Sequence, residues 1–247
     1  FQTEFGLMGT TPRETPEKMA EQVVALCEKG YTCFEPKMTG HLESLDADGD
    51  RLEAILAVAP KEALIMADPN QTWGTAKDSI ELLLRRFQGV QNLAVEQPVM
   101  YHDLKGLAEI TRAVPQKIIA DEAITSVNTM IEIAAHHMAD MISIKLGKCG
   151  GFYKAMQIIR MAEAASMPVR IDWTQGSRLL DTATGHMHAA VRLVACDPGM
   201  DYHLRLKDEP VADGGAQFDG GNCKMPDGPG LGLTMDEEVV KRMSERG

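Results

Sequence analysis

Five charged residues recur along the chain at intervals that suit one strand followed by one helix. Their separations are 31, 28, 25 and 24 residues, and each lies in or at the end of a short apolar run; they are Lys37, Asp68, Glu96, Asp121 and Lys145. Charged side chains almost never stay fully buried without partners. At the carboxyl ends of barrel strands, such side chains share one mouth. We therefore expect these five side chains to converge.

The three acids predict a site for a hard divalent cation. Neighbouring carboxylates do not all ionise without a compensating positive charge, and oxygen ligands favour Mg²⁺, with Mn²⁺ as a substitute. Lys37 and Lys145 would flank the metal from opposite sides, because they fall on the second and sixth of eight strands. A lysine beside a divalent cation has a lowered pKa and serves as a base. This chemistry suits removal of the α-proton of a carboxylate, with the metal stabilising the resulting enediolate.

Neighbouring residues add candidates for the same site. Lys148 lies close to Lys145 in the sequence, but Lys145 is inside the apolar run and Lys148 falls in the following loop, so we assign the base to Lys145. Asp172 and Trp173 end the seventh expected strand and Gln175 follows it, so all three could line a substrate pocket. Packing at the barrel rim is the alternative for Trp173. A cationic substrate group would find a cation–π face there and a counter-charge in Asp172.

Strand-length apolar runs alternate with stretches of helical periodicity, which is typical of β-α units around a parallel sheet. The expected strands span residues 3–8, 31–38, 63–68, 93–97, 117–121, 141–146, 167–173 and 202–206. The first expected helix runs from a cap at Thr15 to Gly30, and the others span 50–58, 76–88, 103–113, 126–138, 152–166 and 180–195. This count predicts a TIM-like α/β barrel. An open doubly wound sheet is the alternative, but no G-x-G-x-x-G turn follows the first strand.

The periodicity fails from about residue 207, where Gly, Pro and Asp become frequent. Such composition is typical of loops. We expect one catalytic barrel domain over residues 1–247, in which about 207–247 form an irregular extension with a closing helix at 235–245.

Composition excludes several classes of protein. The 247 residues carry a net charge of −11, which repels nucleic acid. The five cysteines are odd in number and form no C-x-x-C motif, so we expect a reducing, cytoplasmic location. No apolar run approaches the roughly 20 residues needed to cross a bilayer, and no signal peptide is recognisable. The expected partners are a small-molecule carboxylate and further copies of the chain in a homo-oligomer, with neither nucleic acid nor membrane.

The motifs around the charged residues resemble those of the enolase superfamily, closest to the muconate lactonizing enzyme and mandelate racemase group. The matching segments are GYTCFEPKM, ADPNQTW, VEQPV, IADEA, IKLGKCGG and DGPGLG. The resemblance covers nearly the whole chain. It implies a (β/α)7β barrel and Mg²⁺ held by Asp68, Glu96 and Asp121. It also implies that Lys37 and Lys145 form the acid/base pair and that Asn70 and Glu122 lie just outside the metal ligands.

Two features depart from this group. Its second strand usually reads K-x-K, whereas this chain has Glu35-Pro36-Lys37. The acid removes a cation near Lys37 and would tend to raise the lysine's pKa. The family also has an N-terminal α+β capping domain, which we expect to be absent from this chain because nothing like it precedes Phe1.

The favoured function is racemisation or epimerisation of an amino acid or its derivative through metal-dependent α-proton abstraction. A dehydratase or cycloisomerase would use the same intermediate, so these outcomes remain alternatives. A non-catalytic barrel is a further alternative. A phosphate-binding barrel that uses GKCGG as its phosphate loop is less favoured, because no matching cationic cluster accompanies that segment.

Overall fold

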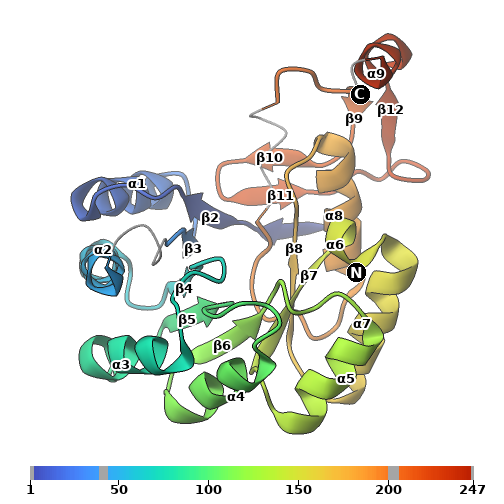
Figure 1. Ribbon diagram of the computed structural model, residues 1–247. Helices are drawn as coiled ribbons and strands as arrows, with labels where there is room; N and C mark the ends of the chain where they lie inside the picture. Colours follow the sequence, from blue (N-terminus) through green and yellow to red (C-terminus); the bar gives the residue numbers. More distant parts are fainter. Residues whose placement is uncertain (1–2, 39–43, 200–205, 246–247) are drawn as a thin grey trace.

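The computed structural model describes residues 3–38, 44–199 and 206–245. Its centre is a curled parallel sheet of seven strands, in which each strand pairs with the next one along the chain (Figure 1). These strands are β2 (Met8–Thr11), β3 (Cys33–Pro36), β4 (Leu64–Ala67), β5 (Leu93–Glu96), β6 (Lys117–Ala120), β7 (Met141–Lys145) and β8 (Val169–Asp172). The α/β barrel expected from the sequence is confirmed, and the six expected strands from 31–38 to 167–173 correspond to β3 to β8.

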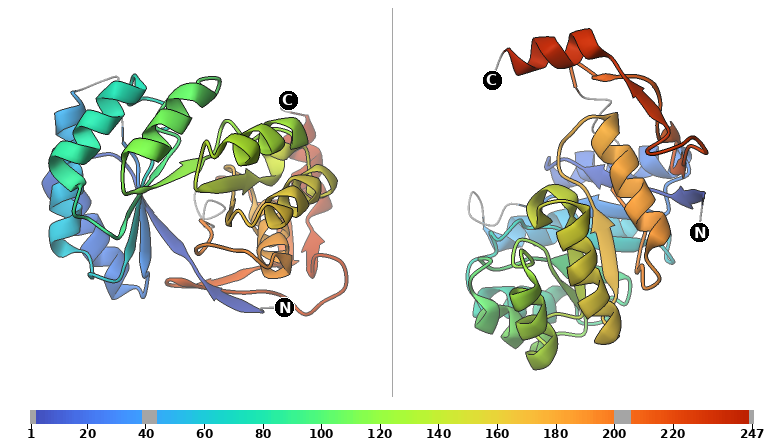
Figure 2. Two further views of the ribbon diagram at one scale, coloured as in Figure 1. Left: turned by 90° about the horizontal axis from the view of Figure 1, so that it is seen from below. Right: turned by 90° about the vertical axis from the view of Figure 1, so that its right-hand side faces the viewer.

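Helices cover the outside of this sheet (Figures 1 and 2). They are α1 (Pro16–Glu28), α2 (Leu45–Val58), α3 (Ala76–Phe87), α4 (Leu104–Ala113), α5 (Val127–His136), α6 (Leu146–Cys149), α7 (Phe152–Ala164) and α8 (Arg178–Ala190). Local capping sets several of their starts. Thr15 accepts a hydrogen bond from the backbone N–H of Lys18 at the start of α1, and Thr75 and Asp78 form a capping box on α3.

Residues 193–198 join the two edges of the sheet. The N–H of Val169 donates to the carbonyl of Leu193, and the N–H of Ala195 donates back to Val169, both at 2.9 Å. The N–H of Met8 donates to the carbonyl of Pro198 at 3.0 Å. The expected helix over 180–195 is therefore wrong beyond Ala190, because these backbone groups bond to β8 and β2 instead. Of the expected eighth strand at 202–206, residues 202–205 lie outside the described residues.

The expected first barrel strand, 3–8, is also wrong in its bounds. β1 (Glu4–Gly6) pairs antiparallel with β11 (Asn222–Lys224), which pairs with β10 (Gln217–Asp219). Leu7 separates β1 from β2, and its N–H donates to the carbonyl of Gly221 at 2.7 Å. One apolar run thus supplies two strands in two sheets, because distant residues bind its first half.

The C-terminal segment is more ordered than its composition indicates. Besides β10 and β11, it contains β9 (Val211–Gly214), paired antiparallel with β12 (Leu233–Met235). The expected closing helix is present as α9 (Glu237–Ser244), and Asp236 caps it. Figure 2 shows β9, β12 and α9 forming an arm that extends away from the barrel.

The strands carry apolar side chains below the expected site. Cys33, Met66, Ala94, Ile119 and Met141 form a buried cluster with Met8. Each lies two or four positions before a charged residue of the same strand, and residues so spaced share a strand face. The strand face that ends in the charged residues therefore begins with apolar side chains, which form an apolar plug beneath the site.

Among the described residues, none of the helices combines the length and apolar character needed to cross a bilayer.

A buried histidine on α8 predicts acid sensitivity. His188 is 4% exposed, and its ring packs on Phe5 with the ring centroids 4.5 Å apart. Burial lowers the pKa of His188 from 6.5 to about 4. The unfolded chain therefore binds this proton first as the pH falls. When the pH is lowered from 7 to 4.5, protonation of this group in the unfolded chain should lower the free energy of unfolding by about 2–3 kcal/mol.

Urea unfolding at the two pH values measures this loss. The variant His188→Gln does not titrate at this position, so its stability should fall less than that of the wild type over the same interval. Equal losses in the two proteins would contradict this assignment.

Candidate functional site

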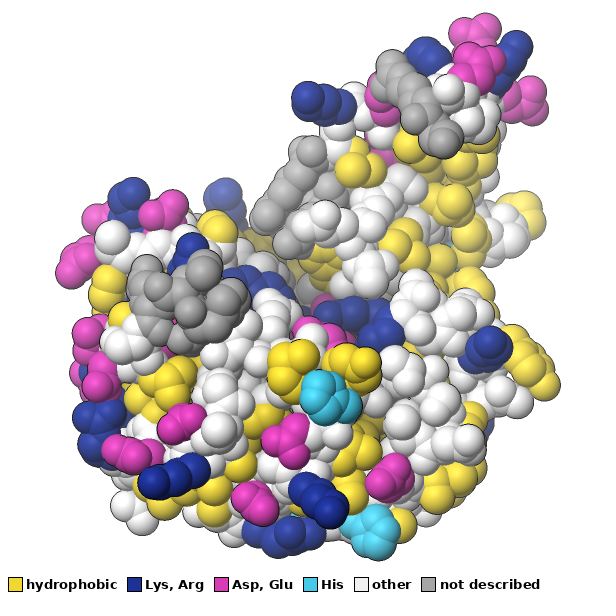
Figure 3. All heavy atoms as spheres, viewed as in Figure 1, with side chains coloured by type: hydrophobic (Ala, Val, Ile, Leu, Met, Phe, Trp, Pro, Cys, Tyr) yellow, Lys and Arg dark blue, Asp and Glu magenta, His cyan; other side chains and the backbone are white. Residues whose placement is uncertain are grey.

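The charged residues predicted from the strand ends meet at one mouth of the barrel. Glu96, Lys145 and Asp172 end their strands, and Lys37 and Asp68 follow β3 and β4 directly and pair with each other in the ladder. Acidic and basic side chains lie together in a hollow on the face drawn in Figure 3. The convergence follows from parallel strands of similar length, whose carboxyl ends share one side.

Asp68, Glu96 and Asp121 are at most 1% exposed. Carboxylate oxygens of Glu96 lie within 4.8 Å of those of Glu35 and Asp68 in one group, and of those of Asp121 and Asp172 in another. Burial, with help from neighbouring acids, raises the pKa of Glu96 well above its usual value and that of Asp68 to about 6. These acids therefore need positive charge to remain ionised.

The predicted lysines reach this cluster from two sides. Lys37 Nζ lies 2.5 Å from Asp68 Oδ2 and also binds Glu35. Lys145 Nζ lies 2.5 Å from Asp121 Oδ2 and 3.1 Å from Asp172 Oδ2. Burial favours the neutral amine, but the adjacent carboxylates outweigh it, and the pKa of both lysines is raised. The lowered pKa expected from the sequence depends on a divalent cation beside the lysines and remains a prediction.

Lys148 is not in a loop, as the sequence had indicated, but on the short helix α6. Its ammonium group donates to Asp121 Oδ1 and, at 3.0 Å, to the carbonyl of Ser143. Burial disfavours the charged form of Asp121, but Lys148 and Lys145 more than offset this effect and lower its pKa to about 2. Two lysines thus share one carboxylate.

Asn70 and Glu122, which the resemblance places just outside the metal ligands, lie in the loops after β4 and β6. The N–H of Asn70 donates to Asp68 Oδ1 at 2.9 Å, and its side-chain amide donates to Glu122 Oε1 at 3.4 Å. The hydrogen bond to Asp68 comes from a residue with a left-handed backbone, φ +43°. The loops after β4 and β6 are therefore tied together next to Asp68 and Asp121.

The three residues expected to bind substrate are placed differently from one another. Asp172 is in the cluster, held by Lys145 and Arg170. Trp173 is 8% exposed and packs in a second apolar cluster with Phe5, Leu7, Ala216, Cys223 and Met225. Gln175 is exposed in the loop between β8 and α8.

Sequence reasoning missed two residues that support the cluster. Arg170 is fully buried on β8 and bonds to Glu35, Glu96 and Asp172. A charge inside the run MPVRIDW, two residues before Asp172, was the available signal, because residues so spaced share a strand face. The second is Gln97, whose Oε1 accepts from the N–H groups of Asp121 and Ala123 at 3.0 and 3.2 Å.

The residues of the cluster fit a divalent cation. Within the described residues, five buried carboxylates face four basic side chains: Glu35, Asp68, Glu96, Asp121 and Asp172 against Lys37, Lys145, Lys148 and Arg170. Glu96 Oε1 is buried and has no hydrogen-bond partner among the described residues. A cluster of hard oxygen donors with one such atom is suited to Mg²⁺.

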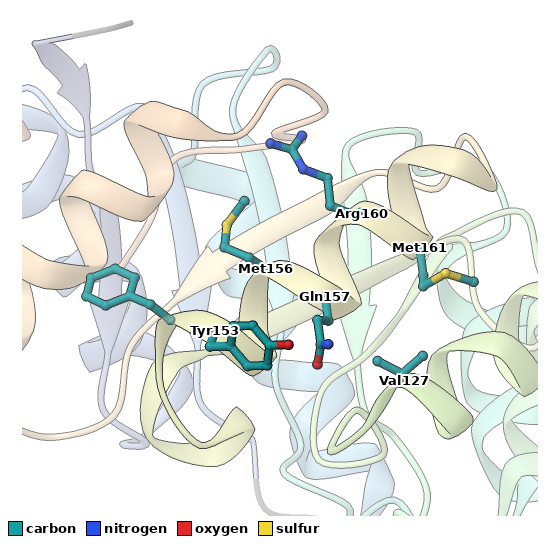
Figure 4. A pocket seen from close by; sticks show the side chains of 7 residues that line it. Val127, Tyr153, Met156, Gln157, Arg160 and Met161 are labelled. Atoms are coloured by element: carbon teal, nitrogen blue, oxygen red, sulfur yellow. The ribbon is translucent and has the colours of Figure 1, made fainter.

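A separate groove lies on the outside of the barrel between α5 and α7 (Figure 4). It has a volume of about 740 Å³, and its lining is mostly apolar: Val127, Phe152, Tyr153, Met156, Gln157, Arg160 and Met161. These side chains come from helix surfaces, whereas the charged residues come from strand ends. The groove is therefore distinct from the candidate site.

Comparison with known proteins identifies the family. The model of the enolase C-terminal domain-like family matches residues 18–239. The chain belongs to this family. The resemblance to the mandelate racemase and muconate lactonizing enzyme group is thereby confirmed, and relatives in that group share the fold of this enolase-like chain.

Several relatives of this enolase-like chain are known. The N-succinyl-L-Arg/Lys racemase of Bacillus cereus is 26% identical over 99% of this chain and 64% of its own length. The L-Ala-D/L-Glu epimerase of Bacillus subtilis is 30% identical over 91% of this chain and 60% of its own length. The solved structure of that epimerase with a bound substrate superposes with a TM-score of 0.87 at 28% identity, covering 95% of this chain and 64% of the other.

This enolase-like chain thus spans less than two thirds of the length of the relatives it matches. Those relatives catalyse more than one outcome: besides racemases and epimerases, they include a muconate cycloisomerase and a cis-3-hydroxy-L-proline dehydratase. Sequence similarity alone therefore does not single out one of the reactions that these relatives catalyse.

Proposed function

We propose that this protein removes the α-proton of a small carboxylate and returns a proton as a racemase or epimerase. The observation that carries the proposal is the pair of ammonium groups of Lys37, directly after β3, and Lys145, at the end of β7, on either side of one buried carboxylate cluster. β3 and β7 are the second and sixth strands of the parallel sheet, and in a closed ring of eight strands these two positions face each other. Two proton carriers on opposite faces of one carbon are what inversion at that carbon requires.

Asp68, Glu96 and Asp121 are proposed to hold Mg²⁺, with Mn²⁺ as a substitute. The bound ion would supply positive charge that stabilises the negative charge developing on the substrate carboxylate. The carboxylates would then attract the lysines less, and the pKa values of Lys37 and Lys145 would fall from their raised values. One lysine, as the neutral amine, takes the α-proton, and the other, as the ammonium, donates a proton to the opposite face.

The substrate is proposed to be an amino acid or its derivative. Relatives named for dipeptides and N-succinyl amino acids support this class. Asp172 carries negative charge at the mouth of the barrel and would suit a substrate ammonium group if Lys145 turned toward the substrate. Trp173, largely buried, and Gln175, exposed in the loop after β8, would contribute at the rim.

Elimination or cycloisomerisation is the second candidate, because it needs only one base. The contact between Glu35 and Lys37 favours it: Glu35 raises the pKa of Lys37 and keeps that group protonated. A protonated Lys37 can donate a proton but cannot abstract one, so abstraction could begin only at the opposite face, that of Lys145.

Proton exchange in D₂O tests the proposal and separates the candidates. We would incubate the protein and Mg²⁺ with dipeptides, N-succinyl amino acids and a 2,3-dihydroxy acid, follow the α-proton by NMR and measure optical rotation. A racemase or epimerase incorporates deuterium and loses optical rotation, whereas a dehydratase accumulates a keto acid. EDTA should stop exchange. Mg²⁺ binding without exchange of any substrate in the panel would contradict the proposal and favour a non-catalytic barrel.

A further inference from the structure

Arg170 is a fully buried arginine directly beneath the candidate metal ligands. Its side chain, on β8, has no exposed surface. Nη1 donates to Glu96 Oε2 at 2.5 Å, and Nη2 donates to Glu35 Oε2 at 2.7 Å and Asp172 Oδ1 at 3.0 Å. One guanidinium group therefore connects carboxylates from β3, β5 and β8. A rigid fork of donors makes such simultaneous contacts possible, and the single ammonium of a lysine does not reproduce them.

The contact with Arg170 makes the two oxygens of Glu96 unequal. Oε2 is bound to Nη1, whereas Oε1 is buried without a hydrogen-bond partner among the described residues. Rotation of the carboxylate would break a short charge-assisted hydrogen bond, which is among the stronger polar contacts in proteins. Arg170 therefore fixes which oxygen of Glu96 remains available for a cation.

Glu35 and Asp172 brace the guanidinium group from two further strands. Glu35 also binds Lys37 through its other oxygen, so Arg170, Glu35 and Lys37 form a chain of charges that ends at Asp68. Arg170 and Lys37 outweigh the burial of Glu35 and lower its pKa. Glu35, at the position where this group usually has a lysine, is thus neutralised by Arg170 on β8.

We propose that Arg170 is a positioning residue that orients Glu96 so that Oε1 faces the divalent ion. The inference rests on the proposed function, since it assigns the metal to the same carboxylates. It adds that Mg²⁺ binding requires the forked donors of the guanidinium group, and that a positive charge alone at this position is not sufficient.

The test measures Mg²⁺ affinity by calorimetry, independently of any substrate. Arg170→Lys keeps the charge and loses the fork, and the dissociation constant for Mg²⁺ should rise about 10- to 100-fold, as is usual when a partner of a metal ligand is lost. Arg51→Lys is the matched control. Arg51 is 6% exposed and is bound to Asp48 and the carbonyl of Glu14, away from the site, so its replacement should leave Mg²⁺ affinity unchanged.

A double-mutant cycle distinguishes orientation from a general structural effect. If Arg170 acts through Glu96, then Glu96→Gln and the double variant with Arg170→Lys should bind Mg²⁺ equally weakly. The effects of substitutions at two residues in contact are generally not additive. Chemical unfolding checks that each variant is folded. Arg170→Gln replaces Arg170→Lys if that variant does not fold.

The outcomes separate the inference from the proposed function. Wild-type Mg²⁺ affinity in folded Arg170→Lys, or additive effects in the cycle, would overturn the role of Arg170 and leave the proposed function standing. Failure of the wild-type protein to bind Mg²⁺ would overturn both.

Discussion

Replacing Lys145 by Ala should lower the rate of α-proton exchange by about 10²- to 10⁴-fold, the range typical for loss of a general acid or base. Lys145 lies 2.5 Å from Asp121 and is 15% exposed, so its ammonium group reaches the mouth of the barrel. Mg²⁺ binding should persist, because the substitution removes a positive charge that competes for the carboxylates. NMR measures the exchange in D₂O, and calorimetry measures the metal.

Lys154→Ala is the matched control for this experiment. Lys154 is exposed on α7, beyond the short helix that follows β7, and its loss should leave exchange unchanged. Lys148→Ala addresses the neighbouring lysine, which also binds Asp121. Exchange that survived in Lys145→Ala and disappeared in Lys148→Ala would reverse the assignment of the base.

Replacing Asp48 by Ala should lower the free energy of unfolding by about 3–5 kcal/mol, the usual cost of breaking a buried ion pair. Asp48 is 1% exposed. Its Oδ1 accepts from Arg51 Nη1 and its Oδ2 accepts from the indole N–H of Trp73, both at 2.9 Å. The substitution leaves a buried guanidinium group and a buried indole N–H without this acceptor. Urea unfolding of the wild type and the variant gives the difference.

Asp46→Ala provides a closely matched comparison. Asp46 is also an acid in the first turn of α2 and also forms ion pairs, with Arg85 and Arg86, but its side chain is 57% exposed. Exposed ion pairs contribute about 0–1 kcal/mol. The two aspartates share the helix dipole, so burial is the main difference between them. Similar losses in the two variants would contradict the explanation.

The sequence predicted the barrel and the residues at its mouth because both depend on local pattern. Each of the charged residues from Lys37 to Lys145 ends an apolar run, and a strand buried on both faces forces such a charge to the end of the sheet or into a pair. Regular spacing then indicated that the runs were equivalent strands. The convergence of these side chains could therefore be predicted without any information about the loops.

Long-range pairing accounts for what the sequence did not predict. The division between β1 and β2 depends on β11, more than 200 residues away, and the end of α8 depends on hydrogen bonds to β8 and β2. The same holds for Arg170, whose partners come from β3 and β5. The placement of Lys148 in a loop was wrong for a different reason: the helix that carries it, α6, has only four residues, too few for a periodic pattern.

The alternation that places the charged residues of the candidate site above an apolar plug on the same strands couples strand register to the geometry of that site. Because every side chain changes face when a strand slips by one residue, a one-residue slip of β5 would turn Glu96 away from the cluster and leave the plug without Ala94. The same slip would therefore disrupt both the apolar plug and the candidate site. Insertions in the connecting loops escape this constraint, because they leave the length and register of the strands unchanged.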